Sequence, residues 1–322
     1  MKLENIINPI LLQNFTTESG AVYSELPLSY ALFGQPLHTA PIVLVNHALT
    51  GNAQVIGENG WWNDLIGADK TIDIHKYTIL AFNVPGNGVD SFLIENHQDF
   101  TARDVARLFL KGIEDLNISK LHTVIGGSVG GGIAWEMLAL SPRITENLIP
   151  IATDWKSTDW LIANCYLQEQ ILKNSSQPIE DARIHAMLCY RSPESFKEKF
   201  NRTINENLAV FNVESWLQHH GTKLQERYQL ASYKMMNQLL KTIDITRNSD
   251  DFETLLSKTD ANIHIVAINS DLFFTPRENL ETYTDLKKFK ENVFYKEIDS
   301  VHGHDAFLIE YKQLDNLLKD IF

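Results

Sequence analysis

Leu121-His-Thr-Val-Ile-Gly-Gly-Ser-Val-Gly-Gly-Gly-Ile-Ala-Trp-Glu136 is the stretch that decides the fold. An apolar, β-branched run enters a glycine-rich turn, and a segment compatible with a helix follows. The turn contains Gly126-x-Ser128-x-Gly130. Side chains beside a serine on so sharp a strand-to-helix turn would clash, which explains the two glycines. The pattern predicts that Ser128 is a nucleophile. It also places the N–H of Val129 at a helix N-terminus, where a negative charge is favoured.

The glycines of this turn permit two other interpretations. A glycine-rich turn can serve only to pack a helix on a strand, or it can hold a phosphate group. No G-x-G-x-x-G or P-loop pattern stands elsewhere in a strand-to-helix position. The context of strand, turn and helix favours the nucleophile.

Strand-like and helix-like segments alternate along most of the chain. Residues 101–116 carry apolar side chains at helical spacing, with Thr101 as the expected N-cap. Residues 10–33 alternate more loosely and are expected to form an antiparallel edge hairpin. This order predicts βαβ units and a mostly parallel central sheet flanked by helices. The expected strands are Pro41–His47, Tyr77–Asn83, Leu121–Gly126, Leu148–Thr153, Ile263–Asn269 and Val293–Ile298.

Strand signals stop between residues 156 and 260. Helical segments fill this region, which predicts a helical lid inserted into an α/β core of residues 1–155 and 261–322. The expected helices are Trp160–Leu172, Ile179–Tyr190, Pro193–Lys199, Val213–Tyr228 and Tyr233–Ile243.

A serine nucleophile needs a histidine base and an acid that orients the histidine. In folds with this type of turn the chain order is serine, acid, histidine. Asp271 and Asp299 each follow an expected strand, and His302 and His304 lie in the last of these loops. We favour Asp271 because it leaves the earlier strand. We favour His304 over His302 because the following segment leads into a final helix that would fix its position.

The oxyanion formed during acyl transfer needs a second N–H donor, usually from a loop after an early strand. Residues 46–51 form such a loop, and the N–H of Leu49 is the expected partner of the N–H of Val129. His47 lies in the same loop, but its place at a strand end favours a structural role.

Composition excludes several classes of protein. The 322 residues include 28 Lys and Arg and 41 Asp and Glu, a net charge of −13 without a basic cluster, which argues against nucleic acid as a partner. The two cysteines have no C-x-x-C spacing, which fits a reducing compartment and excludes a zinc site built on cysteine pairs. No apolar run is long enough for a membrane span, and residues 1–8 lack a signal-peptide pattern. We expect a cytoplasmic protein without a metal site.

Motifs across most of the chain resemble those of homoserine O-acetyltransferases, which have the α/β-hydrolase fold. The most specific is His304-Asp305, because an aspartate directly after the catalytic histidine is not a general feature of hydrolases. The other matching blocks are Asn46–Gly51, Gly60–Gly67, Ile125–Gly131, Ile149–Thr153, Val213–Leu217, Lys223–Tyr233 and Ser270–Asp271.

The resemblance implies a two-step acetyl transfer from acetyl-CoA to L-homoserine, in methionine biosynthesis, with no bound cofactor. Ser128 would carry the acetyl group, and His304 and Asp271 would serve as base and acid. Arg183 would bind the carboxylate of homoserine and Asp305 its ammonium group. The resemblance also implies a homodimer formed through the lid helices.

Two departures from the family pattern keep alternatives open. Residues 83–90 lack the usual longer glycine-rich segment, and the lid is shortened between residues 171 and 179. A serine esterase or thioesterase that uses water, and a homoserine O-succinyltransferase, therefore remain alternatives. A binding protein without activity is disfavoured, because it would have no need of serine, aspartate and histidine together.

Overall fold

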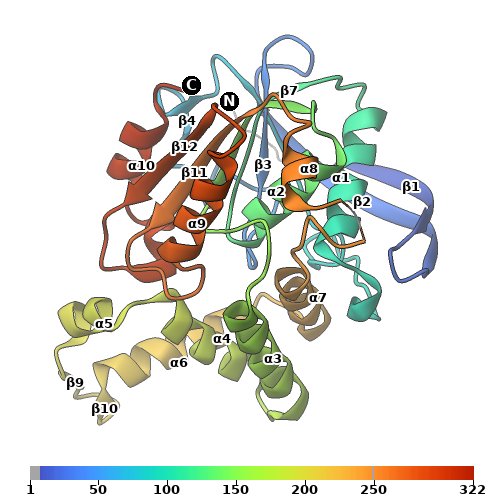
Figure 1. The fold of residues 1–322 in the computed structure, drawn as a ribbon. Helices are drawn as coiled ribbons and strands as arrows, with labels where there is room; N and C mark the ends of the chain where they lie inside the picture. Colours follow the sequence, from blue (N-terminus) through green and yellow to red (C-terminus); the bar gives the residue numbers. More distant parts are fainter. Residues whose placement is uncertain (1–7, 249) are drawn as a thin grey trace.

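The computed structural model describes residues 8–248 and 250–322, so residues 1–7, with most of the segment tested for a signal peptide, lie outside it (Figure 1). Eight strands form the central sheet, in the order β1-β2-β6-β3-β7-β8-β11-β12. They are β1 (Asn8–Thr16), β2 (Val22–Gly34), β3 (Ile42–Asn46), β6 (Thr78–Phe82), β7 (Leu121–Gly127), β8 (Thr145–Ile151), β11 (Asn262–Ile268) and β12 (Val293–Ile298).

The sheet confirms the predicted strands and the edge hairpin. β1 pairs with β2 and β2 with β6 in antiparallel fashion, and the remaining neighbours are parallel. Every residue of β3 and β6 is buried, which explains why these strands are continuous apolar runs. β8 begins at Thr145, earlier than predicted from the apolar run at Leu148, because its first residues are polar although they pair with β7.

Helices cover the sheet on both sides and confirm the predicted α/β fold class. α1 (Ala102–Asp115) begins after the predicted N-cap, because Thr101 Oγ1 accepts from the N–H of Asp104 and the Asp104 carboxylate accepts from the N–H of Thr101. The other helices outside the inserted segment are α2 (Val129–Leu140), α9 (Pro276–Leu286) and α10 (Tyr311–Leu318), with 3₁₀ turns η1 (His97–Asp99) and η2 (Gly303–Leu308).

The helices between β8 and β11 are α3 (Asp159–Asn174), α4 (Pro178–Tyr190), α5 (Pro193–Phe200), α6 (Asn212–Gln225), α7 (Leu230–Lys241) and the short α8 (Phe252–Leu256). Figure 1 shows α3 to α6, coloured green to yellow, gathered at one end of the sheet. A short hairpin of β9 (Ile204–Asn205) and β10 (Val210–Phe211) separates α5 from α6. The sequence did not predict it, since strands of two residues leave no periodic pattern. A second small sheet joins β4 (Ile66–Gly67) to β5 (Ile72–Asp73).

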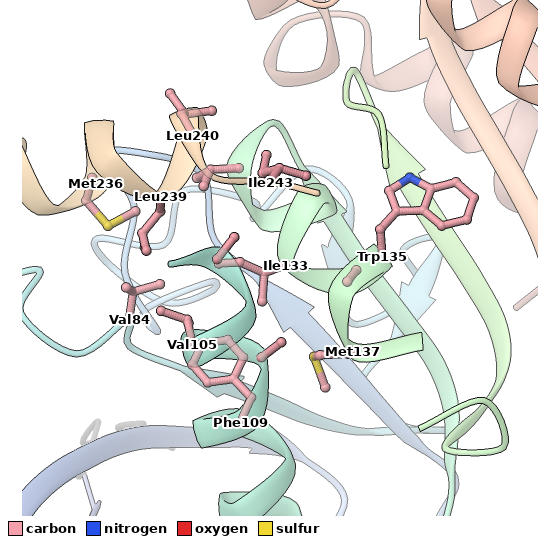
Figure 2. Close-up of a cluster of buried hydrophobic side chains, with 14 of the residues drawn as sticks. Val84, Val105, Phe109, Ile133, Trp135, Met137, Met236, Leu239, Leu240 and Ile243 are labelled. Carbon is pink, nitrogen blue, oxygen red and sulfur yellow. The ribbon is translucent and has the colours of Figure 1, made fainter. Parts of the chain in front are cut away.

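The last long helix of this insertion, α7, is fixed to the core. Met236, Leu239 and Leu240 of α7 belong to the buried cluster that holds Val105 of α1 and Ile133 of α2 (Figure 2). The chain that leaves α7 therefore returns to the sheet through a packed hydrophobic contact.

A buried ion pair adds a polar link at the same junction. Arg103 Nε lies 3.0 Å from Glu136 Oε2, and Arg103 Nη2 donates to the carbonyls of Asp244 and Ile245, just after α7. The second oxygen of Glu136 accepts from the N–H of Asp244 at 3.0 Å. Helices α1 and α2 and the end of the insertion are thus joined through one charged pair.

Candidate active site

Ser128 occupies the turn between β7 and α2, as the glycine spacing predicts. Its φ of 57° and ψ of −130° lie in a region that a residue with a side chain adopts only under strain, which is typical of functional turns. A Cβ atom at Gly130 would lie 2.4 Å from the carbonyl oxygen of Asn46, and one at Gly126 would lie 2.6 Å from backbone atoms of Gly130. Only glycine fits at either position.

His304 and Asp271 meet Ser128 at the carboxyl ends of the strands. His304 Nε2 lies 2.9 Å from Ser128 Oγ, and His304 Nδ1 lies 2.7 Å from Asp271 Oδ2. A carboxylate only accepts, so Nδ1 carries the proton and Nε2 is free to accept from the serine hydroxyl. The other oxygen of Asp271 accepts from the backbone N–H groups of Phe273 and Phe274 at 2.7 and 3.0 Å.

Aromatic rings surround the histidine. Tyr190, Phe273, Phe274 and Phe307 have ring centroids 5.2–5.9 Å from that of His304. The serine, histidine and aspartate are at most 4% exposed. Such an environment excludes water and strengthens the electrostatic interactions inside it.

The two less favoured residues have other partners. His302 Nδ1 lies 3.1 Å from Ser195 Oγ, and the exposed Asp299 accepts from the side-chain amide of Asn269. Neither is hydrogen bonded to Ser128 or His304 among the residues that the structure describes.

One cavity brings together most of the predicted site. Arg183 of α4 and Asp305 of η2, the residues implied by the family resemblance, line it with Ser128 and His304. Leu49 lines it as well, whereas Val129, the first residue of α2, is fully buried and is not among the lining residues. The remaining lining residues are Ala48, Thr50, Tyr190, Phe307 and Leu308.

Two residues that sequence reasoning missed contact the charged residues of this cavity. Arg191 Nε lies 3.1 Å from Asp305 Oδ2, and the Arg191 guanidinium lies 6.0 Å from the ring centroid of Trp216 in α6. Tyr190 packs between His304 and Arg183. The Arg183 guanidinium lies 5.7 Å from the ring centroid of Tyr190. Tyr190 stands seven residues after Arg183 on one helical face, a spacing from which this contact could have been predicted.

His47 is held inside its own loop. The N–H of Val84 donates to His47 Nε2 at 3.0 Å, and His47 Nδ1 donates to the carbonyl of Ala48 at 2.8 Å. Burial lowers the pKa of His47 to about 4, so the ring is neutral near pH 7. The ring therefore connects two loops rather than approaching Ser128.

Comparison with known proteins places the chain in a family. Residues 41–311 match the model of the alpha/beta hydrolase fold. The chain is 32% identical to a homoserine O-acetyltransferase of Cyclobacterium marinum over 329 residues, which covers 95% of this chain and 92% of the relative. It belongs to the homoserine O-acetyltransferase family.

Solved structures agree with membership of the homoserine O-acetyltransferase family. The homoserine O-acetyltransferase of Staphylococcus aureus superposes with a TM-score of 0.83 at 26% identity, over 98% of this chain and 95% of that one. Esterase E22 superposes with a TM-score of 0.86 over 98% of both chains, but at 15% identity this likeness is one of fold alone. Family membership confirms the predicted resemblance and makes the protein an enzyme of the α/β-hydrolase fold.

Two further kinds of feature are absent from residues 8–248 and 250–322. Within these ranges no three His, Cys, Asp or Glu side chains are grouped so that they could hold a metal ion. The same ranges contain no helix with the length and apolarity needed to cross a membrane.

Proposed function

We propose that the protein transfers the acetyl group of acetyl-CoA to the hydroxyl of L-homoserine and so forms O-acetyl-L-homoserine, a precursor for methionine biosynthesis. The observation that carries this proposal is the cavity in which the hydrogen-bonded Ser128 and His304 share a wall with a cation, Arg183, and an anion, Asp305. Homoserine is a zwitterion, and its two charged groups require such a pair. Acetyl-CoA is a substrate in this scheme and not a resident cofactor.

The first half-reaction acylates the serine. Ser128 Oγ attacks the thioester carbonyl while His304 Nε2 takes its proton, and Asp271 holds the ring and stabilises the imidazolium. The N–H groups of Leu49 and Val129 donate to the oxygen on which negative charge develops. The tetrahedral intermediate then expels the sulfur of coenzyme A, which receives the proton from His304.

The second half-reaction transfers the acetyl group to the acceptor. His304 Nε2 takes the proton of the homoserine hydroxyl as its oxygen attacks the acyl-serine, and the same N–H groups hold the second oxyanion. Collapse of the intermediate releases the ester, and His304 returns the proton to Ser128 Oγ. Transfer requires that water is kept out, which the aromatic wall around His304 favours.

Arg183 and Asp305 are proposed to orient the acceptor. The planar guanidinium of Arg183 matches a carboxylate in two hydrogen bonds. Arg191 pairs with Oδ2 of Asp305, while Oδ1 accepts from no other side chain or backbone group within the described ranges. We infer that Oδ1 receives the ammonium group and that Arg191 holds the carboxylate in place for it.

Conservative changes at these two positions are expected to impair the reaction with homoserine but not the reaction with acetyl-CoA. Arg183→Lys removes the two-pronged contact and Asp305→Asn removes the negative charge, so each should lower kcat/KM for homoserine by about 10-fold to 100-fold, as expected for hydrogen bonds to charged groups. kcat/KM for acetyl-CoA should stay within about twofold, because acylation precedes homoserine binding. A loss shared equally by both substrates would contradict the assignment.

Release of thiol from acetyl-CoA, with and without L-homoserine, tests the proposed function. Homoserine-dependent release with O-acetyl-L-homoserine identified by mass spectrometry is the expected result. Release that ignores homoserine, with rapid cleavage of simple esters, would identify a thioesterase or esterase. Activity with succinyl-CoA alone would identify the succinyl donor.

Two further features belong to the same proposal. Apolar side chains exposed on α3 and α4, among them Tyr166 and Leu188, would supply the contact of a homodimer, and the molecular mass in solution tests this. Helices α3 to α6 would act as the lid, and a cytoplasmic location, where acetyl-CoA and homoserine are formed, is inferred from the reaction.

A further inference from the structure

The loop that carries the Leu49 N–H is held by hydrogen bonds on three successive carbonyls. His47 Nδ1 donates to Ala48 O at 2.8 Å, Tyr228 Oη donates to Leu49 O at 2.8 Å, and Arg227 Nη1 donates to Thr50 O at 3.2 Å. The first donor belongs to the loop itself. The other two belong to the segment between α6 and α7, in the helical insertion.

These bonds fix the direction of the Leu49 N–H. A trans peptide is planar, and its C=O and N–H point in opposite directions. The carbonyl of Ala48 and the N–H of Leu49 belong to one peptide unit, so a donor on that carbonyl orients the N–H. Tyr228 holds the peptide unit on the other side of Leu49. With both flanking planes held, the two backbone dihedrals of Leu49 are set.

Tyr228 is suited to this task. The side chain is 6% exposed, and burial raises its pKa, so the hydroxyl keeps its proton and remains a donor. It comes two residues before α7, the helix packed on α1 and α2 in the core (Figure 2). The donor is therefore anchored to the same body that carries Ser128.

We propose that Tyr228 is a positioning residue for the oxyanion site: together with His47 it aims the N–H of Leu49 at the tetrahedral intermediate. This inference rests on the proposed acyl-transfer function and adds a residue from the inserted helices to it. Tyr228 contacts neither acceptor nor donor in this scheme and acts only through the Leu49 peptide.

The substitution Tyr228→Phe tests the proposal, since it removes the hydroxyl and keeps the ring. Both half-reactions pass through an oxyanion at the same N–H, so kcat/KM for acetyl-CoA and for homoserine should fall by the same factor, about 10-fold or more, up to the 10²–10³-fold of a lost donor. Affinity for propylboronic acid, whose serine adduct is tetrahedral, should fall in parallel. This common loss differs from the single-substrate loss expected at Arg183.

Tyr77→Phe is the matched control. Tyr77 is also buried, and its hydroxyl also donates to a main-chain oxygen, that of Phe322 at 3.0 Å, but it directly precedes the amino end of β6, away from the site. Both variants should lose a similar amount of thermal stability, and only Tyr228→Phe should lose activity. Arg227→Gln releases Thr50 O and also removes a positive charge near Arg183. As a second variant it should lower kcat/KM for acetyl-CoA by a smaller factor than Tyr228→Phe does.

Three outcomes would overturn the proposal: kinetics of Tyr228→Phe equal to those of Tyr77→Phe, a loss confined to one substrate, or an unchanged boronate affinity. If the unaltered protein transfers no acetyl group to homoserine, the proposed function fails on its own. Tyr228→Phe and Tyr77→Phe are then compared by the rate at which p-nitrophenyl acetate acylates the serine and the rate at which water removes the acetyl group. Serine ester hydrolysis uses the same oxyanion site, so the comparison still tests the proposal.

Discussion

Replacing Ser128 by alanine is expected to lower the rate of acetyl transfer by about 10³-fold or more, since the attacking atom is removed. Its Oγ is the only atom that connects His304 to a thioester carbonyl in the proposed mechanism, and it lies 2.9 Å from His304 Nε2. Steady-state release of thiol measures the loss. Mass spectrometry after mixing with acetyl-CoA should find one acetyl group on Ser128 in the unaltered protein and none in the variant.

The neighbouring histidines provide the matched control for this prediction. His304→Ala should approach the loss seen with Ser128→Ala, because the two residues act as a unit. His302→Ala, in the same loop but paired with Ser195, should keep most of the activity. Equal melting temperatures would show that the fold is intact. Activity that survives in Ser128→Ala would mean that another group carries the acyl chain.

Replacing Arg103 by methionine is expected to lower the free energy of unfolding by about 3–5 kcal/mol, since it leaves a charge buried without its partner. Glu136 is fully buried and lies 3.0 Å from Arg103 Nε. Burial already raises the pKa of Glu136 although Arg103 opposes this, so the carboxylate depends on the guanidinium. Urea unfolding followed by circular dichroism measures the change.

Two variants show whether the unpaired buried charge causes the loss of stability in Arg103→Met. Arg103→Met combined with Glu136→Gln should recover part of the stability, because no unpaired charge remains. Lys120→Met breaks an exposed pair with Glu146, whose atoms lie 3.3 Å apart, and should cost no more than about 1 kcal/mol. If Arg103→Met costs no more than Lys120→Met, the ion pair contributes little to joining the insertion to the core.

The glycine turn at Ser128 and the sheet were predictable because their physical requirements are local. Gly126 and Gly130 are needed because a Cβ atom at either position would clash with backbone atoms, and the sequence shows this requirement as the spacing of the two glycines around Ser128. The inner parallel strands β3 and β6 are buried on both faces, so they stand out as apolar runs. The order of serine, acid and histidine then assigned Ser128, Asp271 and His304 to loops at one edge.

The contacts made by the inserted helices were not predictable in this way. Arg191 meets Asp305 across more than a hundred residues of sequence, and Tyr228 meets Leu49 over a longer interval. Such pairs depend on how α4 and the end of α6 are placed over the sheet. A single tyrosine or arginine on a helix carries no pattern that distinguishes such a contact from an exposed position.

His304 and Asp305 are consecutive residues of one 3₁₀ turn, so the proposed base and the proposed ammonium site share a peptide bond. A change in this loop that moved the aspartate toward a different acceptor would also move the histidine away from Ser128. Arg183 lies on α4, and its guanidinium packs on Tyr190, whose ring in turn packs against His304. A change of acceptor through position 183 would therefore leave His304 in place, whereas an insertion into the turn after β12 would disturb the proposed base and the proposed ammonium site together.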